Sequence, residues 1–365
     1  MSESYVGLDV HSKTTEFVIE DASGTVMREG QVPTTEEGLR SLIETFGVPP
    51  GSRVALETGT MARYVVDQLR QLGLDPVVID AHEVRLKAYR PRQKSDRRDA
   101  FEICEGLRRD LYRTIVHMPP KQIQRLREML SLRRHFVRVQ SSETIAAKHV
   151  LRAAGLGRLS RQLQTESGWQ RLLVQFDGIL RARLEAHHAV WRAAGEQVRK
   201  LEDSIFEQSH FFEEDFQRLQ TVPGVGPIVA LTAIAAFSDA RRFPSAKHAA
   251  SYAGLVPSTS QSGDRDWHGH ITKQGSAELR SMLCEAAHHA SRKSNPLNPH
   301  FARLCARRGY KMAVTAVAHR LCRMLYAMLR DKAELKIEKL GIEVGPFQRK
   351  VVTPYRLRRK VLLHG

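Results

Sequence analysis

The sequence predicts an α/β domain at the front, a long helical middle and a mostly α-helical C-terminal domain. Short apolar runs alternate with amphipathic helical patterns over 1–115, which is typical of a mixed sheet with flanking helices. Over 116–215 the strand-like runs cease and apolar residues recur at helical spacing. Turns that contain Gly and Pro separate shorter helices over 216–335. The last segment, 336–365, is predicted to be a basic tail.

Three candidate strands open the N-terminal domain. Tyr5–Asp9 is a short apolar run that ends in an aspartate. Thr15–Glu20 and Thr25–Gln31 are further strand candidates, and the turn-like sequence Asp-Ala-Ser-Gly at 21–24 separates them. We therefore expect hairpin connections between successive antiparallel strands at the start of the sheet.

Helices then begin to alternate with strands. Thr34 is a candidate N-cap for a helix through Phe46, and Glu37 three residues later completes a capping box. Two further strands are expected at Val54–Glu57 and Pro76–Asp80. Two further helices are expected at Met61–Leu72 and Ser95–Arg108. Ser95 is the predicted N-cap of the last helix. This order predicts a mixed sheet covered by helices.

The middle of the chain shows sustained helical periodicity. Ile123, Leu126 and Leu130 form one apolar stripe. A second helix has apolar positions at alternating four- and three-residue spacing, namely Leu180, Leu184, His187, Trp191, Ala194, Val198, Leu201 and Ile205. This spacing keeps one seam toward a partner helix. Two long helices joined through Gly155–Gly157 fit an intramolecular hairpin and a dimerising coiled coil equally well.

The C-terminal region begins with a glycine-rich turn. Val222–Pro227 precedes an apolar helix and resembles the hairpin of a helix-hairpin-helix, in which backbone N–H groups approach a phosphate. The alternative is a tight turn between helices with no ligand. A Gly- and Ser-rich loop is expected over Gly254–Gly275, followed by helices around Ala277–Ser291 and Tyr310–Arg330. The tail Arg349–Lys360 carries six basic residues and no acidic one, which is typical of a nucleic-acid-binding arm.

Composition indicates a polyanionic partner. The formal net charge is +17, and clustered Lys and Arg bind phosphates by displacing counterions. No apolar run reaches the roughly 18 residues that a membrane span needs, and the N-terminus lacks a signal-peptide pattern. We expect a cytoplasmic protein without a membrane partner. Four cysteines have no paired metal-ligand spacing, and we interpret them as reduced core residues: Cys104, Cys284, Cys305 and Cys322.

Four acidic residues are placed for metal binding. Asp9 and Glu57 each end an apolar predicted strand, where a carboxylate is costly unless it finds a partner. Asp96 and Asp99 are three residues apart on a predicted helix, so both project from one face. Taken singly, each acid is explained as a turn residue or as a favourable charge at a helix N-terminus. Together, on a basic chain, they predict a site for Mg²⁺ or Mn²⁺ ions that act on a phosphodiester.

The segments that carry these acids resemble a known family. Tyr5–His11, Ala55–Gly59 and Lys94–Ala100 are similar to the three sequence blocks of the DEDD insertion-sequence transposases. The front domain of that family is similar to the Holliday-junction resolvase RuvC and has the ribonuclease H fold. The resemblance implies that the metal-binding, catalytic acids are Asp9, Glu57, Asp96 and Asp99.

The back half resembles the C-terminal domain of the same family. The similarity includes the turn at Val222–Pro227 and four later segments, which are Tyr252–Pro257, Gln261–Gly263, Ile271–Gly275 and Leu279–Arg280. The resemblance implies a nucleophilic serine at Ser262. The residues themselves leave Ser258 and Ser260 as alternatives, and a Ser-Gly pair is also common in plain turns. A free serine needs a nearby base or metal to become a good nucleophile.

Other side chains near these segments are candidates for phosphate contact. Arg265, Lys273 and Arg280 could neutralise the charge of a phosphate near Ser262. The candidate histidine ligands or bases are His11, His268 and His270. His268 and His270 stand two apart in the predicted loop without further ligands at a recognisable spacing. We therefore interpret those two as loop residues that contact phosphate.

The family resemblance implies an enzyme that cuts and rejoins DNA strands to move its own element. It further implies that the partners are donor DNA, target DNA and a structured bridge RNA encoded by the element. It also implies dimers that pair into tetramers with a composite active site, in a bacterial protein associated with the nucleoid. A junction-resolving endonuclease would need the four acids without the serine. A non-enzymatic nucleic-acid scaffold would explain the charge alone. The segment Gly7–Ser12 also suits an actin-like ATPase, but the sequence has no convincing second Gly-rich phosphate loop.

Overall fold

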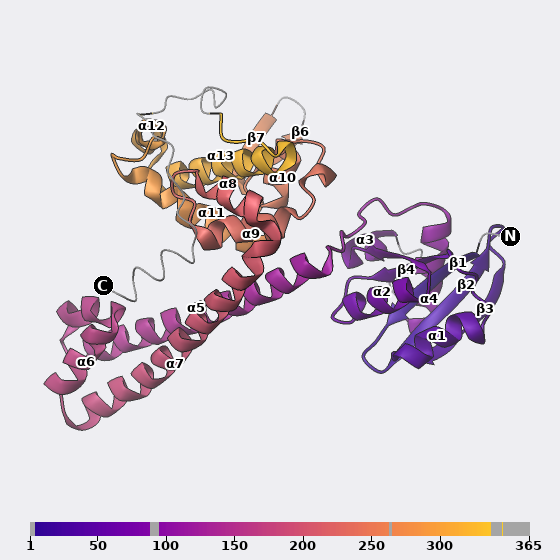
Figure 1. Ribbon diagram of the computed structural model, residues 1–365, viewed down its shortest axis with the longest axis horizontal. Helices are drawn as coiled ribbons and strands as arrows, with labels where there is room; N and C mark the ends of the chain where they lie inside the picture. The colour runs from indigo at the N-terminus through magenta and orange to yellow at the C-terminus, as the bar shows by residue number, and fades with distance from the viewer. Residues whose placement is uncertain (1–3, 88–94, 263–264, 337–344, 346–365) are drawn as a thin grey trace. The chain divides into compact units, whose positions relative to one another are not determined.

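A computed structural model describes residues 4–87, 95–262, 265–336 and 345, with the side chains of 259–268 left out of the description. The chain forms two compact units, Met1–Pro119 and Pro120–Gly365 (Figure 1). The predicted tail Arg349–Lys360 lies outside the described residues. Within the described part no helix is both long and apolar enough to cross a membrane.

The N-terminal unit contains a five-stranded mixed sheet of order β3-β2-β1-β4-β5. Its strands are β1 (Ser4–Val10), β2 (Thr14–Asp21), β3 (Val26–Pro33), β4 (Arg53–Glu57) and β5 (Asp75–Ile79). The first three strands are antiparallel neighbours, whereas β4 and β5 run parallel to β1. The predicted mixed sheet is therefore confirmed, with the strand-end acids of β1 and β4 on neighbouring parallel strands.

Helices cover both faces of this sheet. They are α1 (Glu36–Glu44), α2 (Ala62–Gln71), α3 (Ala81–Lys87) and α4 (Asp96–Arg108). Val6 and Leu8 of β1 share a core with residues of α1 and α2, whereas Gly7 points to the other face and contacts α4. A Cβ atom at Gly7 would lie 2.2 Å from the carbonyl oxygen of Ala100. Glycine thus allows α4 to pack at backbone contact distance on β1.

One predicted helix start is wrong by one residue. The N-cap of α1 is Thr35, whose hydroxyl accepts a hydrogen bond from the Gly38 N–H at 3.2 Å. The Thr34 hydroxyl is used elsewhere, because it donates to the His11 carbonyl and bonds to the Thr15 hydroxyl. The predicted capping box therefore does not form. The N-cap of α4 is confirmed, since the Ser95 hydroxyl accepts from the Arg98 N–H.

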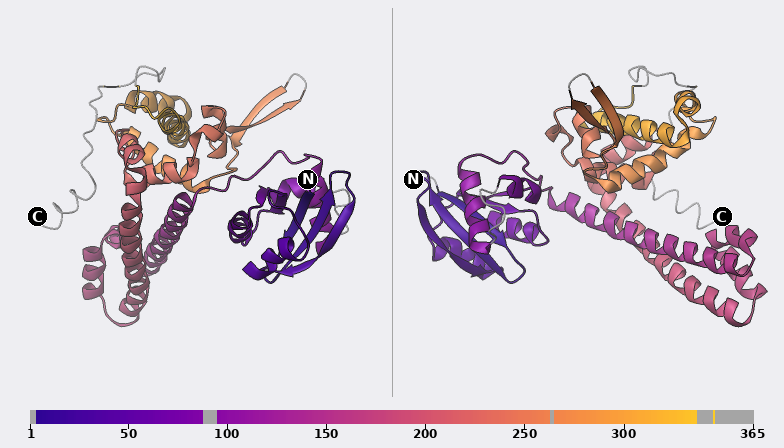
Figure 2. Two further views of the ribbon diagram at one scale, coloured as in Figure 1. Left: turned by 45° about the vertical axis from the view of Figure 1, so that its right-hand side comes forward. Right: turned by 180° about the vertical axis from the view of Figure 1, so that it is seen from behind.

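The C-terminal unit contains a long helical hairpin. Helices α5 (Lys121–Ala153) and α7 (Gly178–Gln208) lie antiparallel along each other, with η1 (Gly157–Gln164) and α6 (Glu166–Gln175) at the tip (Figures 1 and 2). An ion pair between Arg133 and Glu202 joins the two long helices at 2.6 Å. Of the two sequence-based alternatives, the hairpin within one chain is therefore present. A dimerising role stays a prediction.

The remainder is a helical core with one small hairpin. Its elements are η2 (Ser209–Phe212), α8 (Glu213–Gln220), α9 (Pro227–Phe237), η3 (Ala240–Arg242), α10 (Ala246–Tyr252), β6 (Pro257–Ser262), β7 (Arg265–Ile271), α11 (Ala277–His288), η4 (His289–Ser291), α12 (Asn298–Arg308) and α13 (Tyr310–Asp331). The predicted loop over Gly254–Gly275 is wrong, because β6 and β7 pair as an antiparallel hairpin. Polar residues fill both strands, so they lack the apolar alternation that reveals a strand in a sequence.

The turn before α9 has a packing function. Gly224 adopts φ +89, and a Cβ atom there would lie 2.7 Å from the Ala286 carbonyl of α11. A residue with a side chain does not fit at this position, because the positive φ would strain its backbone and the Cβ atom would clash with the neighbouring helix. Packing thus accounts for this glycine, and the phosphate-binding role of Val222–Pro227 stays a prediction.

A buried charge cluster holds the far end of α4 to β2. Glu20 of β2 is fully buried, and Arg108 donates to its carboxylate at 3.1 Å and to Glu105 at 2.6 Å. Burial raises the pKa of Glu20 to about 7, and the negative charge of Glu105 adds to this effect, while Arg108 opposes it. The cluster therefore contains one carboxyl group that is protonated well above its ordinary range.

This raised pKa predicts a pH-dependent stability of the N-terminal unit. The unfolded chain releases the Glu20 proton near its ordinary pKa of 4.5, and the folded chain releases it near 7. Stability is therefore greatest below about pH 4.5 and falls as pH rises through 7, by on the order of 1–3 kcal/mol. We expect Glu20→Gln to remove most of this loss.

The measurement uses Cys104, a buried thiol of α4 and the only cysteine of this unit. The rate at which the Cys104 thiol reacts with an aromatic disulfide reagent is measured at increasing urea concentrations. The urea concentration at which the thiol becomes reactive gives the unfolding midpoint at pH 5 and at pH 7.5. Glu16→Gln, on the same strand but half exposed, is the matched control. Equal pH dependence in the wild type and in Glu20→Gln would contradict the assignment.

Candidate metal centre

Asp9 lies at the carboxyl end of β1, on the face that α4 covers. Gly7 faces α4, and residues two apart on a strand share a face, so Asp9 also points to this side. The Asp9 side chain is 15% exposed. A carboxylate that is so largely desolvated needs an opposite charge or hydrogen-bond donors close by.

Glu57 occupies the matching position on β4. Leu8 pairs with Leu56 in the parallel register, so the next residues, Asp9 and Glu57, are level with each other on neighbouring strands. Ala55, two residues before Glu57, shares a core with Ile103 of α4, which places Glu57 on the α4 face as well. The pleat thus sends both strand-end carboxylates to one side of the sheet.

The first turn of α4 brings two further acids to the same side. Ala100 and Ile103 are buried between α4 and the sheet. Asp96 and Asp99 precede them by four residues each, so they lie one turn earlier on the sheet-facing stripe of the helix. Oxygens of Asp96 and Asp9 lie within 4.8 Å of each other.

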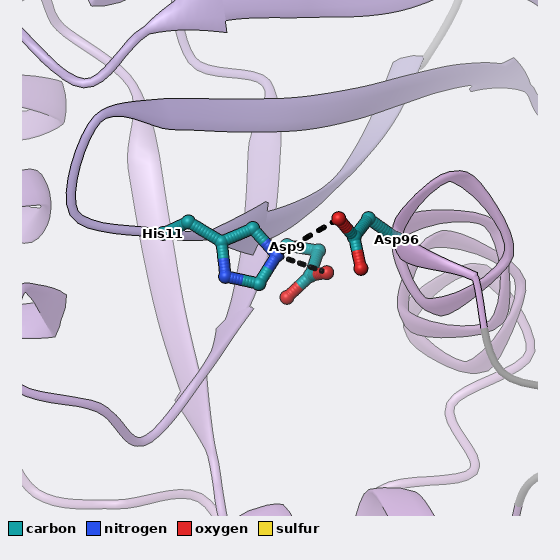
Figure 3. Close-up of side chains that lie close together, drawn as sticks. All are labelled: Asp9, His11 and Asp96. Atoms are coloured by element: carbon teal, nitrogen blue, oxygen red, sulfur yellow. Dashed lines mark ion pairs between the residues drawn. The ribbon is translucent and has the colours of Figure 1, made fainter.

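His11 completes this group and is one of the histidines that the sequence offered as candidate ligands or bases. Its Nε2 atom lies 3.1 Å from a carboxylate oxygen of Asp9 and 3.4 Å from one of Asp96 (Figure 3). His11 comes directly after the end of β1, in the turn to β2, where its backbone N–H donates to the Thr14 carbonyl at 2.9 Å. The Thr34 hydroxyl donates to the His11 carbonyl and fixes this backbone. The two-residue spacing from Asp9 was the available signal in the sequence.

The donor atoms of this group fit a divalent cation. Within 4–87, 95–262, 265–336 and 345, Asp9, His11 and Asp96 form the one group of three such side chains whose ligand atoms lie mutually within 4.8 Å. Carboxylate oxygens suit Mg²⁺ and Mn²⁺, and an imidazole nitrogen suits Mn²⁺ better than Mg²⁺. The Asp96 side chain is 55% exposed, which leaves one side of the group accessible from solvent.

Neighbouring arginines pair with acids outside this group. Arg97 donates to Glu29 of β3 at 3.0 Å, and Arg98 donates to Glu102 at 3.1 Å. Both guanidinium groups therefore form ion pairs with other carboxylates, although Arg97 and Arg98 directly follow Asp96 in the sequence. His11 lies within ion-pair distance of both Asp9 and Asp96.

The structure places the predicted nucleophile on the β6–β7 hairpin. Ser262 is the last residue of β6 and pairs with Arg265, but both side chains, like that of Ser260, lie outside the described residues, as does Gly263. The Ser258 hydroxyl donates to the His270 carbonyl at 3.1 Å and so forms a cross-strand hydrogen bond. The hairpin therefore gives Ser258 a structural function.

The surroundings of the hairpin correct two expectations. His268 and His270 lie in β7, so their placement in a loop is wrong. Arg280 of α11 donates to the Ala253 carbonyl at 3.0 Å and thereby fixes the end of α10. Lys273, which follows β7, is exposed and adopts φ 56. Its ammonium group is accessible to an anion beside the hairpin.

Comparison with known proteins identifies both halves of the chain. A family model described as "Transposase", of the DEDD type found in IS110 elements, matches residues 6–155. A second model, described as "Transposase IS116/IS110/IS902 family", matches residues 216–303. The chain belongs to the IS110/IS116 family of transposases. The first match spans the four acids, and the second spans the β6–β7 hairpin.

Individual relatives agree with this assignment. The "probable family 20 transposase" of Pseudomonas aeruginosa is 27% identical over 303 residues, which cover 77% of this chain and 84% of that protein. The transposase for insertion sequence element IS1111A of Coxiella burnetii is 24% identical over 267 residues, or 71% and 72% of the two chains. The pilin gene-inverting protein of Moraxella bovis is 35% identical over 116 residues, or 31% and 36%. Membership implies DNA cleavage and strand transfer as the general activity.

The site geometry predicts a measurable metal affinity. Replacing Asp9 with Asn removes the carboxylate charge that is nearest to both His11 and Asp96, so the affinity for Mn²⁺ should fall about tenfold or more. Electron paramagnetic resonance of free Mn²⁺ during titration gives the dissociation constant.

The matched control for this measurement is Asp75→Asn. Asp75 is exposed at the start of β5, which is the opposite end of the parallel strands. This variant should bind Mn²⁺ as the wild type does. An Asp9→Asn protein with unchanged affinity would show that the metal binds elsewhere.

Proposed function

We propose that the IS110/IS116-family chain cleaves and rejoins DNA with two groups of residues, an acid cluster for divalent ions and a serine nucleophile. The acid cluster consists of Asp9, Glu57, Asp96 and Asp99, and the nucleophile is Ser262. The observation that supports the metal site most directly is the approach of Asp9 and Asp96, which come from a strand and a helix far apart in the sequence. Register and helical spacing support the placement of the other two acids.

Each part contributes a distinct function in this proposal. The N-terminal unit would have the ribonuclease H fold of RuvC-like nucleases, and its acids would hold Mg²⁺ or Mn²⁺. When bound, such ions stabilise the negative charge that develops on the attacking and leaving oxygens of a phosphodiester. The carboxylates of Asp9 and Asp96 would hold the ions, and the packing of α4 on β1 keeps both carboxylates at one edge of the sheet.

The serine step conserves the phosphodiester bond energy. The Ser262 hydroxyl loses its proton as its oxygen bonds to phosphorus. The bond from phosphorus to the leaving strand oxygen breaks, and that oxygen takes up a proton. One ester bond replaces another, so the hydroxyl of a second strand can reverse the step and complete the exchange. The name of the Moraxella bovis relative, a pilin gene-inverting protein, is consistent with such rejoining chemistry.

Replacing Ser262 tests the serine step. We expect Ser262→Ala to abolish both strand exchange and the covalent protein–DNA adduct, which is detected as labelled DNA that migrates with denatured protein. Ser258→Ala is the matched control, because the Ser258 hydroxyl donates to the backbone of β7. It should retain the adduct. If the protein is instead a junction-resolving endonuclease without a serine step, the Ser262→Ala variant will cleave DNA as the wild type does.

We further propose that the protein binds donor and target DNA together with a structured bridge RNA, as dimers that pair into tetramers. The net charge of +17 and the exposed basic residues of the C-terminal unit support a large polyanionic partner. The composite site would join the acid cluster of one subunit to Ser262 of another.

Purified protein should carry the proposed RNA. Sequencing of the co-purified nucleic acid should return one discrete RNA that is encoded beside the gene, since a guide is bound tightly enough to survive purification. Asp9→Asn should retain it, because the acids are not expected to hold the RNA. Recovery of only heterogeneous cellular RNA would contradict guidance while leaving the metal and serine proposals intact.

A further inference from the structure

A cavity of about 420 Å³ lies at the base of the β6–β7 hairpin. Helices α5, α9 and α11 and the end of α10 form its walls. The chain segments before and after the hairpin meet there, because a Cβ atom at Gly275 would lie 2.2 Å from the Tyr252 carbonyl. Its volume is within the range of small-molecule sites, roughly 300–1,000 Å³. The cavity thus adjoins the element that carries Ser262.

Two polar groups of this cavity lack hydrogen-bond partners. Thr232 of α9 is 2% exposed, and its hydroxyl makes no hydrogen bond. The half-buried Glu278 carboxylate accepts no hydrogen bond from any residue that the structure describes. Burial raises the pKa of Glu278, which reflects this poor solvation. Buried polar groups are normally satisfied, so the Thr232 hydroxyl lacks a partner that a ligand can supply, and the half-buried Glu278 carboxylate can accept hydrogen bonds from the same ligand.

The other walls favour a flat, uncharged body. Leu130 and Ala235 provide apolar surface, and Tyr252 provides an aromatic ring. The Ser276 hydroxyl is already used, because it caps α11 by accepting from the Leu279 N–H at 3.3 Å. The Glu278 and Thr232 side chains can therefore orient a ligand, and the exposed hydroxyl of Ser131 also lines the cavity.

The charge around the cavity is positive. Arg127 lines it and donates to the Ala235 carbonyl at 2.8 Å. Arg134, Arg133 and Arg138 also act on Glu278, since their charges oppose the rise of its pKa. A cationic ligand would be repelled by these guanidinium groups, whereas the phosphates of a nucleotide would be attracted. The ligand that fits is a neutral base with N–H donors on a negatively charged backbone.

We propose that the cavity receives one unpaired guanine base of a nucleic-acid strand, held at its Watson–Crick edge by Glu278. Guanine presents two neighbouring donors, N1–H and the 2-amino group, which match the two oxygens of a carboxylate. Thymine presents a single N–H donor. The Thr232 hydroxyl lies on another wall and contacts the base. The inference rests on the proposed recombinase function, because it places the base beside the hairpin of Ser262.

The test compares single-stranded oligonucleotides by fluorescence anisotropy with the full-length protein in EDTA. A thymine tract with one central guanine should bind about tenfold more tightly than the plain thymine tract, because hydrogen bonds to a charged acceptor are strong. Hypoxanthine, which lacks the 2-amino group, should fall between them. DNA and RNA versions of each strand identify which nucleic acid supplies the base.

Glu278→Gln should reduce the guanine preference to about twofold or less, because the neutral amide offers one acceptor in place of two. Glu285→Gln is the matched control, since Glu285 is exposed on the same helix and the charge change is identical. It should keep the preference. Thr232→Val, which preserves the shape of the side chain, should lower the affinity for the guanine strand more than the affinity for the plain thymine strand. Equal melting temperatures of all variants confirm folding.

The outcomes separate this inference from the proposed function. Asp9→Asn and Ser262→Ala should keep the guanine preference in EDTA although they lose strand exchange. Equal affinity of the wild type for guanine and thymine strands would overturn the inference, as would a Glu278→Gln protein that retains the preference. Failure of the Ser262→Ala test alone would overturn the serine mechanism and leave base recognition standing.

Discussion

The packing of α4 directly on β1 determines whether an acid cluster can exist in this protein. Gly7 leaves room for the backbone of Ala100, so the helix approaches the strand more closely than any side chain would allow. This closeness lets a carboxylate in the first turn of α4 reach the strand-end carboxylate of Asp9. Two carboxylates at such spacing repel each other. A bound divalent cation would offset this repulsion, and His11 lies within ion-pair distance of both carboxylates.

The opposite end of the same helix is fixed by a second charge cluster. Arg108 bonds to Glu20 of β2 and to Glu105 of its own helix, where burial and not solvent determines the protonation of Glu20. The helix is thus attached to the sheet at two places, by close packing of Ala100 and Cys104 on Gly7 and by ion pairs of Arg108 at its C-terminal end. Such attachment holds the acids in place before a metal or a substrate binds, which reduces the cost of ordering them later.

Local patterns in the sequence predicted the features that depend on local physics. Strand ends, helix periodicity and the Ser95 cap follow from short-range preferences, and the placement of Asp9 and Glu57 follows once both strands are parallel neighbours. Tertiary competition caused the errors. The Thr34 hydroxyl prefers Thr15 and His11 to the helix N-terminus, and the polar β6–β7 strands lack an apolar pattern. The contact of His11 with Asp96 depends on how α4 is placed on the sheet, so no local pattern could reveal it.

The long α5–α7 hairpin interrupts a core that is otherwise continuous. Leu126 and Leu130 near the start of α5 share one core with Ile205 near the end of α7, together with Phe216 of α8. The chain therefore leaves this core along α5 and returns to it along α7. Removing equal numbers of heptads from both arms would preserve the seam between them and leave the core residues in place. The core that anchors the hairpin therefore does not determine how long the hairpin is.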